Sequence, residues 1–170
     1  INGGTGTIQS NDTDNVVIAN AIVLNGDLTL AGAKPLTFSG AIDLDGGART
    51  ITNGIAAEMT FNGDFSNGTS LTIANSHAGT PGTIHLNGNN TSLTSLTLSS
   101  GTLGIDGDDA LGSASLELDD TTLRVTETTT IDNAISIGSG GGTIEVDSGK
   151  TVTFSGELSG SGTLTKTGDG

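Results

Sequence analysis

Residues 28–44 read LTLAGAKPLTFSGAIDL, and this stretch holds the pattern that decides the fold. Residues 28–30, 36–38 and 42–44 each place one polar residue between two apolar residues. Such alternation is typical of β-strands, because successive side chains of a strand point to opposite faces. Glycine or proline lies between the three segments, where the chain must turn. The stretch therefore predicts three short strands joined by sharp corners.

The same alternation recurs along the chain, at a spacing of roughly seven to twelve residues. Asn-Gly, Asp-Gly or Ser-Gly pairs lie between many of these segments, and both Asn and Gly tolerate the positive φ angles of tight corners. No segment shows the apolar spacing of an amphipathic helix over three turns. Further strands are expected at residues 16–18, 21–24, 50–52, 59–61, 71–73, 84–86, 96–98, 116–118, 123–125, 135–137, 144–146, 152–154 and 164–165.

Two all-β architectures fit short strands with glycine-rich corners: a parallel solenoid, and an antiparallel sandwich or barrel. The composition favours the solenoid. Only 32% of the residues are hydrophobic, and the chain has four Phe but no Trp or Tyr to join the two sheets of a sandwich. A solenoid needs only a thin aliphatic layer in each coil. We therefore expect an all-β, right-handed, single-stranded parallel β-helix (β-solenoid) with three strands per coil, roughly 20–27 residues per coil and roughly 6–8 coils.

The charge of the chain limits its partners. Acidic residues outnumber basic residues by 19 to 5, which gives a net charge of −14. Nucleic acids and anionic membranes require a basic surface, so neither is expected as a partner. Divalent cations remain open as ligands. The chain has no Cys, which excludes disulfides and thiolate metal sites, and no apolar run reaches the about 18 residues of a membrane-spanning helix.

Residues 82–113 carry a resemblance to a known family. They read GTIHLNGNNTSLTSLTLSSGTLGIDGDDALGS, and residues 161–170 read SGTLTKTGDG. This pattern resembles the passenger-associated β-strand repeat of autotransporters, the proteins of type V secretion, with one unit at about 82–113 and the next starting at about 161. The family often has an aromatic residue where this chain has residues 92–94. The residues that match the repeat motif are Gly82, Thr83, Leu86, Gly88, Asn90, Gly101, Thr102, Leu103, Ala110, Leu111, Gly112, Gly162, Thr163, Leu164, Lys166 and Gly168.

The resemblance implies a function in secretion. Residues 1–170 would form a single β-helix segment, an excerpt of a longer passenger. The parent chain would carry a C-terminal outer-membrane β-barrel translocator, which exports the passenger and anchors it at the bacterial surface. A structural stalk that promotes passenger folding and secretion is the first functional expectation. The alternative is an adhesin module that binds host or neighbouring-cell surfaces.

Histidine-dependent catalysis finds little support in the sequence. His77 and His85 are the two histidines, and without Cys they leave few candidates for a nucleophile and its base. His85 is expected at an outward strand position and His77 in a loop. The stretch 74–82 is the most loop-like of the chain, and it is where an adhesive surface would be sought.

Carboxylates spaced two residues apart are a second candidate for catalysis. On a strand such residues share one face, at a separation that inverting glycosidases also use. We interpret them as exposed polar positions, because the chain has few aromatic or basic residues to hold a sugar. We therefore expect no catalytic residue, no metal site and no cofactor. The pairs are Asp43 with Asp45, Glu117 with Asp119, and Glu145 with Asp147.

Two other binding functions depend on repeated residues. Residues 106–109 (DGDD) and 119–120 (DD) could offer oxygen ligands to calcium, but they do not match the spacing of known calcium loops. Ice binding would need two Thr per strand in register. The Thr-x-Thr pairs at 50/52, 128/130, 151/153 and 163/165 are scattered, so ice binding is not expected.

Overall fold

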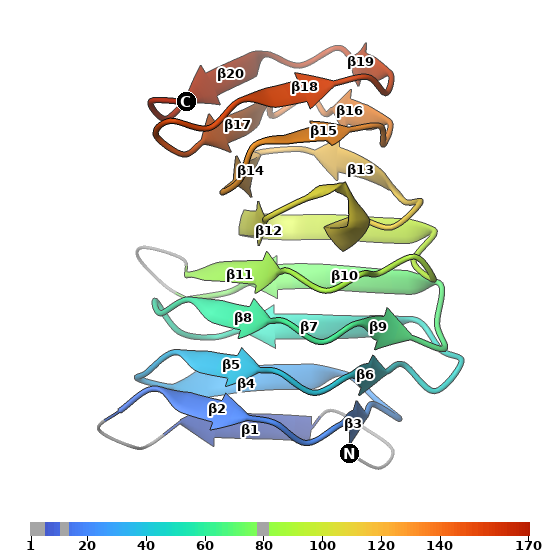
Figure 1. Ribbon diagram of the computed structural model, residues 1–170, viewed down its shortest axis with the longest axis vertical. Coiled ribbons are helices and arrows are strands. Elements are labelled where there is room, and N and C mark those ends of the chain that lie inside the picture. The colour runs from blue at the N-terminus through green and yellow to red at the C-terminus, as the bar shows by residue number, and fades with distance from the viewer. Residues whose placement is uncertain (1–5, 11–13, 78–81) are drawn as a thin grey trace.

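The computed structural model, which describes residues 6–10, 14–77 and 82–170, is a parallel β-solenoid of about seven turns. In Figure 1 the coils stack along the long axis, from β1 at the bottom to β20 at the top. All strand pairings among the described residues are parallel. The parallel solenoid is thereby confirmed, and the antiparallel alternative is wrong for the described residues.

The strands form three faces, which we call A, B and C. Face A contains β1 (Gly6–Ser10), β4 (Leu28–Gly32), β7 (Arg49–Asn53), β10 (Ser70–Asn75), the first half of β12 (Ser95–Ile105), β13 (Ser115–Leu118), β16 (Ile135–Ile137) and β19 (Leu158–Gly160). Face B contains β2 (Val16–Ile18), β5 (Leu36–Phe38), β8 (Met59–Phe61), β11 (Thr83–Leu86), the second half of β12, β14 (Thr121–Val125), β17 (Gly142–Val146) and β20 (Leu164–Thr167). Face C contains two separate sheets, one of β3 (Ile22–Val23), β6 (Ile42–Asp43) and β9 (Phe65–Ser66), the other of β15 (Thr129–Ile131) and β18 (Val152–Phe154).

The coils differ slightly in length. Along face A, Leu71 pairs with Leu96, Leu96 with Leu116 and Leu116 with Ile135, so successive coils are 25, 20 and 19 residues long at this position. The predicted range of 20–27 residues is therefore nearly right: two spacings fall one residue short, Leu116 to Ile135 on face A and Ile84 to Leu103 on face B. In the coil of β12, a single 3₁₀ turn, η1 (Asp108–Ala110), lies where other coils carry a face C strand.

The core is a column of aliphatic side chains that runs along the axis. On face B, paired residues of successive coils point inward and are buried; they include Leu36, Met59, Ile84, Leu103, Leu123 and Ile144. Three Phe thicken the core in the second and third coils, where the rings of Phe38 and Phe61 stack at 4.6 Å and Phe65 lies 5.3 Å from Phe61. Each such side chain contributes about 1.5–3 kcal/mol by leaving water, so the fold needs no wide aromatic core.

Two expectations about local structure require correction. The sequence predicts a separate short strand at residues 96–98, but β12 runs unbroken from Ser95 to Ile105 through the corner between faces A and B. Gly101 makes this possible, because it adopts a φ of 77° and a side chain there would collide with Asn75. The stretch 74–82 is not all loop, since β10 extends to Asn75; its residues 78–81 lie outside the described residues.

Candidate functional site

The predicted repeat unit, residues 82–113, covers β11, β12 and η1. Its apolar motif residues Leu86, Leu103, Ala110 and Leu111 are all buried in the core. The glycines lie where coils approach closely: a side chain on Gly88 would place its Cβ 2.5 Å from the carbonyl oxygen of the coil before it. Most motif residues of this unit therefore serve the packing of one coil on the next. Their role as a functional repeat stays a prediction.

Asn90 of the motif connects three coils. Its side chain is fully buried. Its Oδ1 accepts a hydrogen bond from the backbone N–H of Phe65 (2.8 Å), and its Nδ2 donates to the carbonyl oxygen of Ala110 (2.8 Å). Asn133 has a similar role in a later coil, where its Nδ2 donates to the carbonyl oxygens of Gly112 (3.0 Å) and Ala114 (2.8 Å). These amides satisfy backbone groups that no strand pairing reaches at the corners.

The C-terminal motif residues Gly162, Thr163, Leu164, Lys166 and Gly168 lie in the last coil. Leu164 is 43% exposed there, because no further coil covers it in the structure. The pairing of β17 with β20 places Lys166 opposite the buried Ile144. Its Nζ donates to the carbonyl oxygens of Thr167 (3.2 Å) and Gly168 (2.9 Å).

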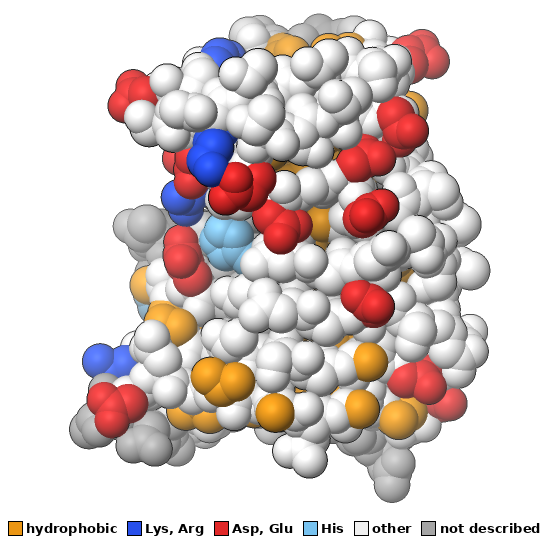
Figure 2. Space-filling view, viewed as in Figure 1, with side chains coloured by type: hydrophobic (Ala, Val, Ile, Leu, Met, Phe, Trp, Pro, Cys, Tyr) orange, Lys and Arg blue, Asp and Glu red, His pale blue; other side chains and the backbone are white. Residues whose placement is uncertain are grey.

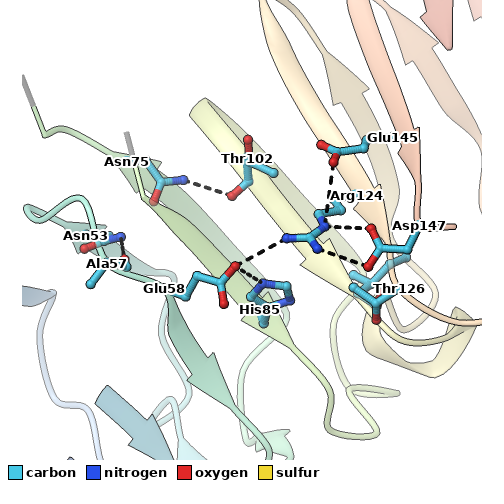
Figure 3. Close-up of polar contacts among 11 residues, drawn as sticks. Asn53, Ala57, Glu58, Asn75, His85, Thr102, Arg124, Thr126, Glu145 and Asp147 are labelled. Carbon is cyan, nitrogen blue, oxygen red and sulfur yellow. Dashed lines mark hydrogen bonds and ion pairs between the residues drawn. The ribbon is translucent and has the colours of Figure 1, made fainter. Parts of the chain in front are cut away.

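Face B carries a cluster of polar and charged side chains that spans five coils, shown in Figure 3. We call Glu58, His85, Arg124, Glu145 and Asp147 the polar clasp. Arg124 donates to both oxygens of Asp147, from Nε (2.9 Å) and from Nη2 (3.0 Å). Its Nη1 donates to Oε1 of Glu58 (3.3 Å), 66 residues earlier, and its Nε lies 3.9 Å from Glu145. One guanidinium thereby connects the coil before β11 with the coil of β17.

A glycine makes this reach possible. In the outward column of face B, His85 pairs with Gly104 and Gly104 pairs with Arg124. A side chain on Gly104 would collide with the imidazole of His85, which lies over it. His85 is accordingly buried (9% exposed) although its strand position points outward. Its Nε2 lies 3.6 Å from Glu58 and has no hydrogen-bond partner.

Two members of the clasp, Arg124 and Asp147, have shifted pKa values. The hydrogen bond between Arg124 and Asp147 raises the pKa of the guanidinium and lowers the pKa of the carboxyl group, so both stay charged. Asp106, nearby after β12, behaves in the opposite way, because burial raises the pKa of its carboxyl group. The bidentate pair is geometrically specific, but its partly exposed groups contribute modestly to stability. One signal of the clasp is visible in the sequence, an Arg at an outward strand position in a chain with five basic residues.

At least one member of each of the three carboxylate pairs makes a structural contact. Asp43 Oδ1 accepts hydrogen bonds from the backbone N–H of Asp45 (2.7 Å) and from Asn67 Nδ2 (3.0 Å). Asp45 itself lies beyond β6 in a left-handed conformation, so this pair does not share a strand face as predicted. Asp119 Oδ1 accepts from the backbone N–H of Gly140 (2.6 Å), while Glu117 is exposed on face A. The third pair, Glu145 and Asp147, belongs to the clasp.

The acidic stretch 106–109 borders a hollow of about 440 Å³ that Asn87 and Thr129 also line. Asp108 Oδ1 accepts a hydrogen bond from the backbone N–H of Asp132 (3.0 Å), which ties two coils together. Among the residues that the structure describes, no three His, Cys, Asp or Glu side chains converge to hold a metal ion. Figure 2 shows acidic side chains gathered over the middle coils of the visible face and also at its upper and lower edges, while exposed hydrophobic ones are most frequent over the lowest coils.

The threonines are more regular than the sequence indicates. The predicted Thr-x-Thr pairs form a double row over two coils only, where residues 128 and 130 stack on residues 151 and 153 and Thr130 pairs with Thr153. Single Thr residues stack in register along face B over five coils. Each pairs with the next across β11, β12, β14, β17 and β20; they are Thr83, Thr102, Thr122, Thr143 and Thr165. We call this row the threonine ladder. The residues two positions after the ladder residues on the same strands include members of the clasp, and they do not form a second row of Thr. His77 lies apart from both features, with Nδ1 3.2 Å from the carbonyl oxygen of Gly54.

Within the described residues, no helix is long and apolar enough to cross a membrane. No family model matches the chain, and no solved structure matches it. The chain is 32% identical, over 178 aligned positions, to an adhesin autotransporter, BmaC, of Brucella suis biovar 1 (strain 1330). The alignment covers 99% of this chain and 5% of that much longer relative. The resemblance noted in the sequence is thereby confirmed: the chain is homologous to a segment of an autotransporter adhesin and has the β-solenoid fold expected of an autotransporter passenger domain.

Proposed function

We propose that this chain is a non-catalytic stalk segment of an autotransporter passenger, and that the stacking of its coils promotes passenger folding and secretion across the outer membrane. In this proposal the parent chain carries a C-terminal β-barrel translocator that anchors the passenger at the cell surface. The observation that supports it is the uninterrupted parallel pairing of each coil with its neighbours along faces A and B.

Nearest-neighbour stacking gives a physical basis for the secretion role. A coil that has already folded presents a ready strand edge and an apolar layer to the coil that emerges next. Each added coil buries its inward Leu, Ile or Val side chains, so its folding is favourable at every step. The chain also contains no Cys, so no disulfide could form before export and obstruct passage.

A deletion that preserves the register tests this proposal. Removing residues 84–122 from the full-length parent would join Thr83 to Leu123, and Leu123 would take the position of Ile84 in the face B column. The matched control removes residues 16–58, so that Met59 takes the position of Val16. Each deletion excises two coils, but only the first removes the repeat unit. Passenger outside the cell is then quantified, with barrel insertion measured separately.

If the repeat promotes export, surface delivery falls sharply for the first deletion and much less for the control. Equal delivery from both variants and the unaltered parent would contradict a secretion role and leave a passive spacer.

An adhesin module is the second candidate. The name of the Brucella relative states that it is an adhesin, and this chain aligns with a segment of it over nearly its whole length. The surface also offers a region suited to contact with neutral partners: in β4, β7 and β10 the outward residues of face A are Thr, Ala or Ser, including Thr29, Thr50, Thr52 and Thr72. Cells that display the parent with and without residues 16–58 distinguish the two functions, since loss of attachment at normal surface delivery would favour adhesion.

A further inference from the structure

A hollow of about 190 Å³ lies at the corner between faces A and B in the last three coils. Residues 140–142, three consecutive glycines at the corner of the middle coil, line part of it and contribute no side chains. The corner is fixed in place: the backbone N–H of Asp120 donates to the carbonyl oxygen of Gly141 (2.7 Å), and that of Gly142 donates to Thr163 (2.9 Å). The hollow is therefore set by backbone geometry and not by mobile side chains.

Hydroxyl groups dominate the lining. Thr122, Thr143 and Thr165, the last three members of the threonine ladder, line the hollow in register. Adjacent parallel strands put them about 4.8 Å apart, and each hydroxyl can both donate and accept a hydrogen bond. Thr121 also lines the hollow, but its side chain alternates with that of Thr122 and is buried toward the core, so its Oγ1 is not offered to a ligand.

The only charged group among the residues that line the hollow is the carboxylate of Asp120. Together with the net charge of −14, it disfavours an anionic ligand. A divalent cation needs several oxygen ligands, commonly with more than one carboxylate, and in the described chain no three acidic or His side chains converge. An apolar ligand would leave the hydroxyls without partners. The lining therefore suits a small, neutral ligand with several hydroxyl groups.

From these observations we propose that the hollow binds one sugar ring of a neutral glycan. The Thr hydroxyls and the Asp120 carboxylate would pair with the hydroxyls of the ring, which offer both donors and acceptors. The hollow is smaller than the sites of drug-sized ligands and has no aromatic residue on which a sugar could stack, so each site binds in the millimolar range. This inference rests on the adhesive role of the passenger, in which many weak contacts at once give firm attachment.

The test is a titration of the ¹⁵N-labelled chain with methyl glucoside, methyl mannoside, methyl galactoside and N-acetylglucosamine, followed by amide chemical shifts. At least one of these sugars shifts the amides of residues 120–122 and 140–143 in a saturable manner. N-acetylneuraminic acid, an anionic sugar, and calcium chloride produce no such shifts at the same concentrations. If none of the neutral sugars shifts these amides, or if calcium alone does, the inference is overturned.

Two variants connect the binding to the hollow. Thr143→Val keeps the β-branched shape but removes a hydroxyl, and it weakens binding about fivefold, as expected for one hydrogen bond. Asp120→Asn removes the charge at a residue whose φ of 55° Asn tolerates, and it weakens binding by a similar or larger factor. Thr102→Val is the matched control, because Thr102 belongs to the same ladder but does not line the hollow. Equal binding by all three variants and the unaltered chain would overturn the inference.

Attachment of cells separates this inference from the adhesive function itself. If cells that display the parent with Asp120→Asn and Thr143→Val lose attachment to a surface coated with the bound sugar, the hollow serves adhesion to glycans. If the sugar binds the unaltered chain but cells with the two substitutions still attach to the coated surface as before, the ligand of the hollow is a free saccharide and not a surface glycan. If no sugar binds while cells still adhere, adhesion stands and the sugar site is refuted.

Discussion

Replacing Asn90 with Ala is the sharpest test of how the coils are held together. The substitution removes the hydrogen-bond acceptor of the Phe65 N–H and the donor to the Ala110 carbonyl oxygen. Both backbone groups are then left without a hydrogen-bond partner at a buried site, since the Asn90 side chain is 0% exposed. An unsatisfied buried group costs about 1–3 kcal/mol, so Asn90→Ala lowers the free energy of unfolding by about 2–6 kcal/mol. Because natural domains are stable by only about 5–15 kcal/mol, such a loss is large.

The assay is urea denaturation followed by circular dichroism, together with native-state hydrogen exchange of the Phe65 amide. Protection of that amide falls in Asn90→Ala, since its acceptor is gone. Asn90→Asp keeps an acceptor for Phe65 but cannot donate to Ala110, so it retains some of the protection and still loses stability. Asn89→Ala is the control, because Asn89 is exposed and its backbone N–H, not its side chain, bonds to Asp64 (2.8 Å). If Asn90→Ala unfolds within about 0.5 kcal/mol of the unaltered chain, the change expected of a surface substitution, the reasoning is refuted.

Three further predictions concern the polar clasp and its surroundings. Gly104→Ala displaces the His85 ring and lowers stability by about 1–3 kcal/mol, as overpacking does; thermal unfolding no different from that of the unaltered chain would contradict this. The hydrogen bond from Arg124 lowers the pKa of Asp147, so the ionised pair contributes its full stability above the ordinary carboxyl pKa of 3.8 and loses it as the pH falls below that value. Asp147→Asn should therefore flatten the acid limb of a plot of stability against pH, and an unchanged limb would refute the pairing. Burial raises the pKa of Asp106, so its ionised form disfavours the fold at neutral pH; Asp106→Asn should leave stability equal or higher at pH 7, and a clear loss would show that the carboxylate has a favourable partner.

The fold was predictable because one local pattern repeats. Triplets such as residues 36–38 and 59–61 alternate in hydropathy, and the structure places both in face B with Leu36 paired to Met59. The pattern fixes which side chains point inward, and the scarcity of aromatic residues limits the width of the core. The alternating pattern does not fix where a strand ends. The unbroken passage of β12 through the corner at Gly101 depends on Asn75 of the preceding coil, which lies 26 residues earlier and leaves no mark in the local sequence.

The candidate sites were less predictable, because they depend on register between coils. The clasp requires Arg124 to lie beside a glycine of the coil before it, and the coils differ in length, so no fixed repeat places Glu58 within reach. The threonine ladder is hidden for the same reason: pairs such as residues 50 and 52 are evident in the sequence, whereas the stack of Thr122 on Thr143 appears only when the register is known.

Cysteine cross-linking reports on the stacking of the coils in parallel register. The chain has no Cys of its own, so two introduced Cys residues form the one possible disulfide. Thr122 and Thr143 pair in adjacent strands, where their Cα atoms lie about 4.8 Å apart, within the span of a disulfide. Thr122 and Thr165 are two coils apart, at about 9.6 Å, beyond that span.

The measurement is the rate of disulfide formation in the two double variants under mild oxidation, read by electrophoretic mobility with and without reductant. We expect fast, nearly complete cross-linking of Thr122→Cys with Thr143→Cys, and almost none of Thr122→Cys with Thr165→Cys. Equal cross-linking of both pairs, or failure of the adjacent pair, would contradict the parallel solenoid on which the stalk, the ladder and the sugar site all depend.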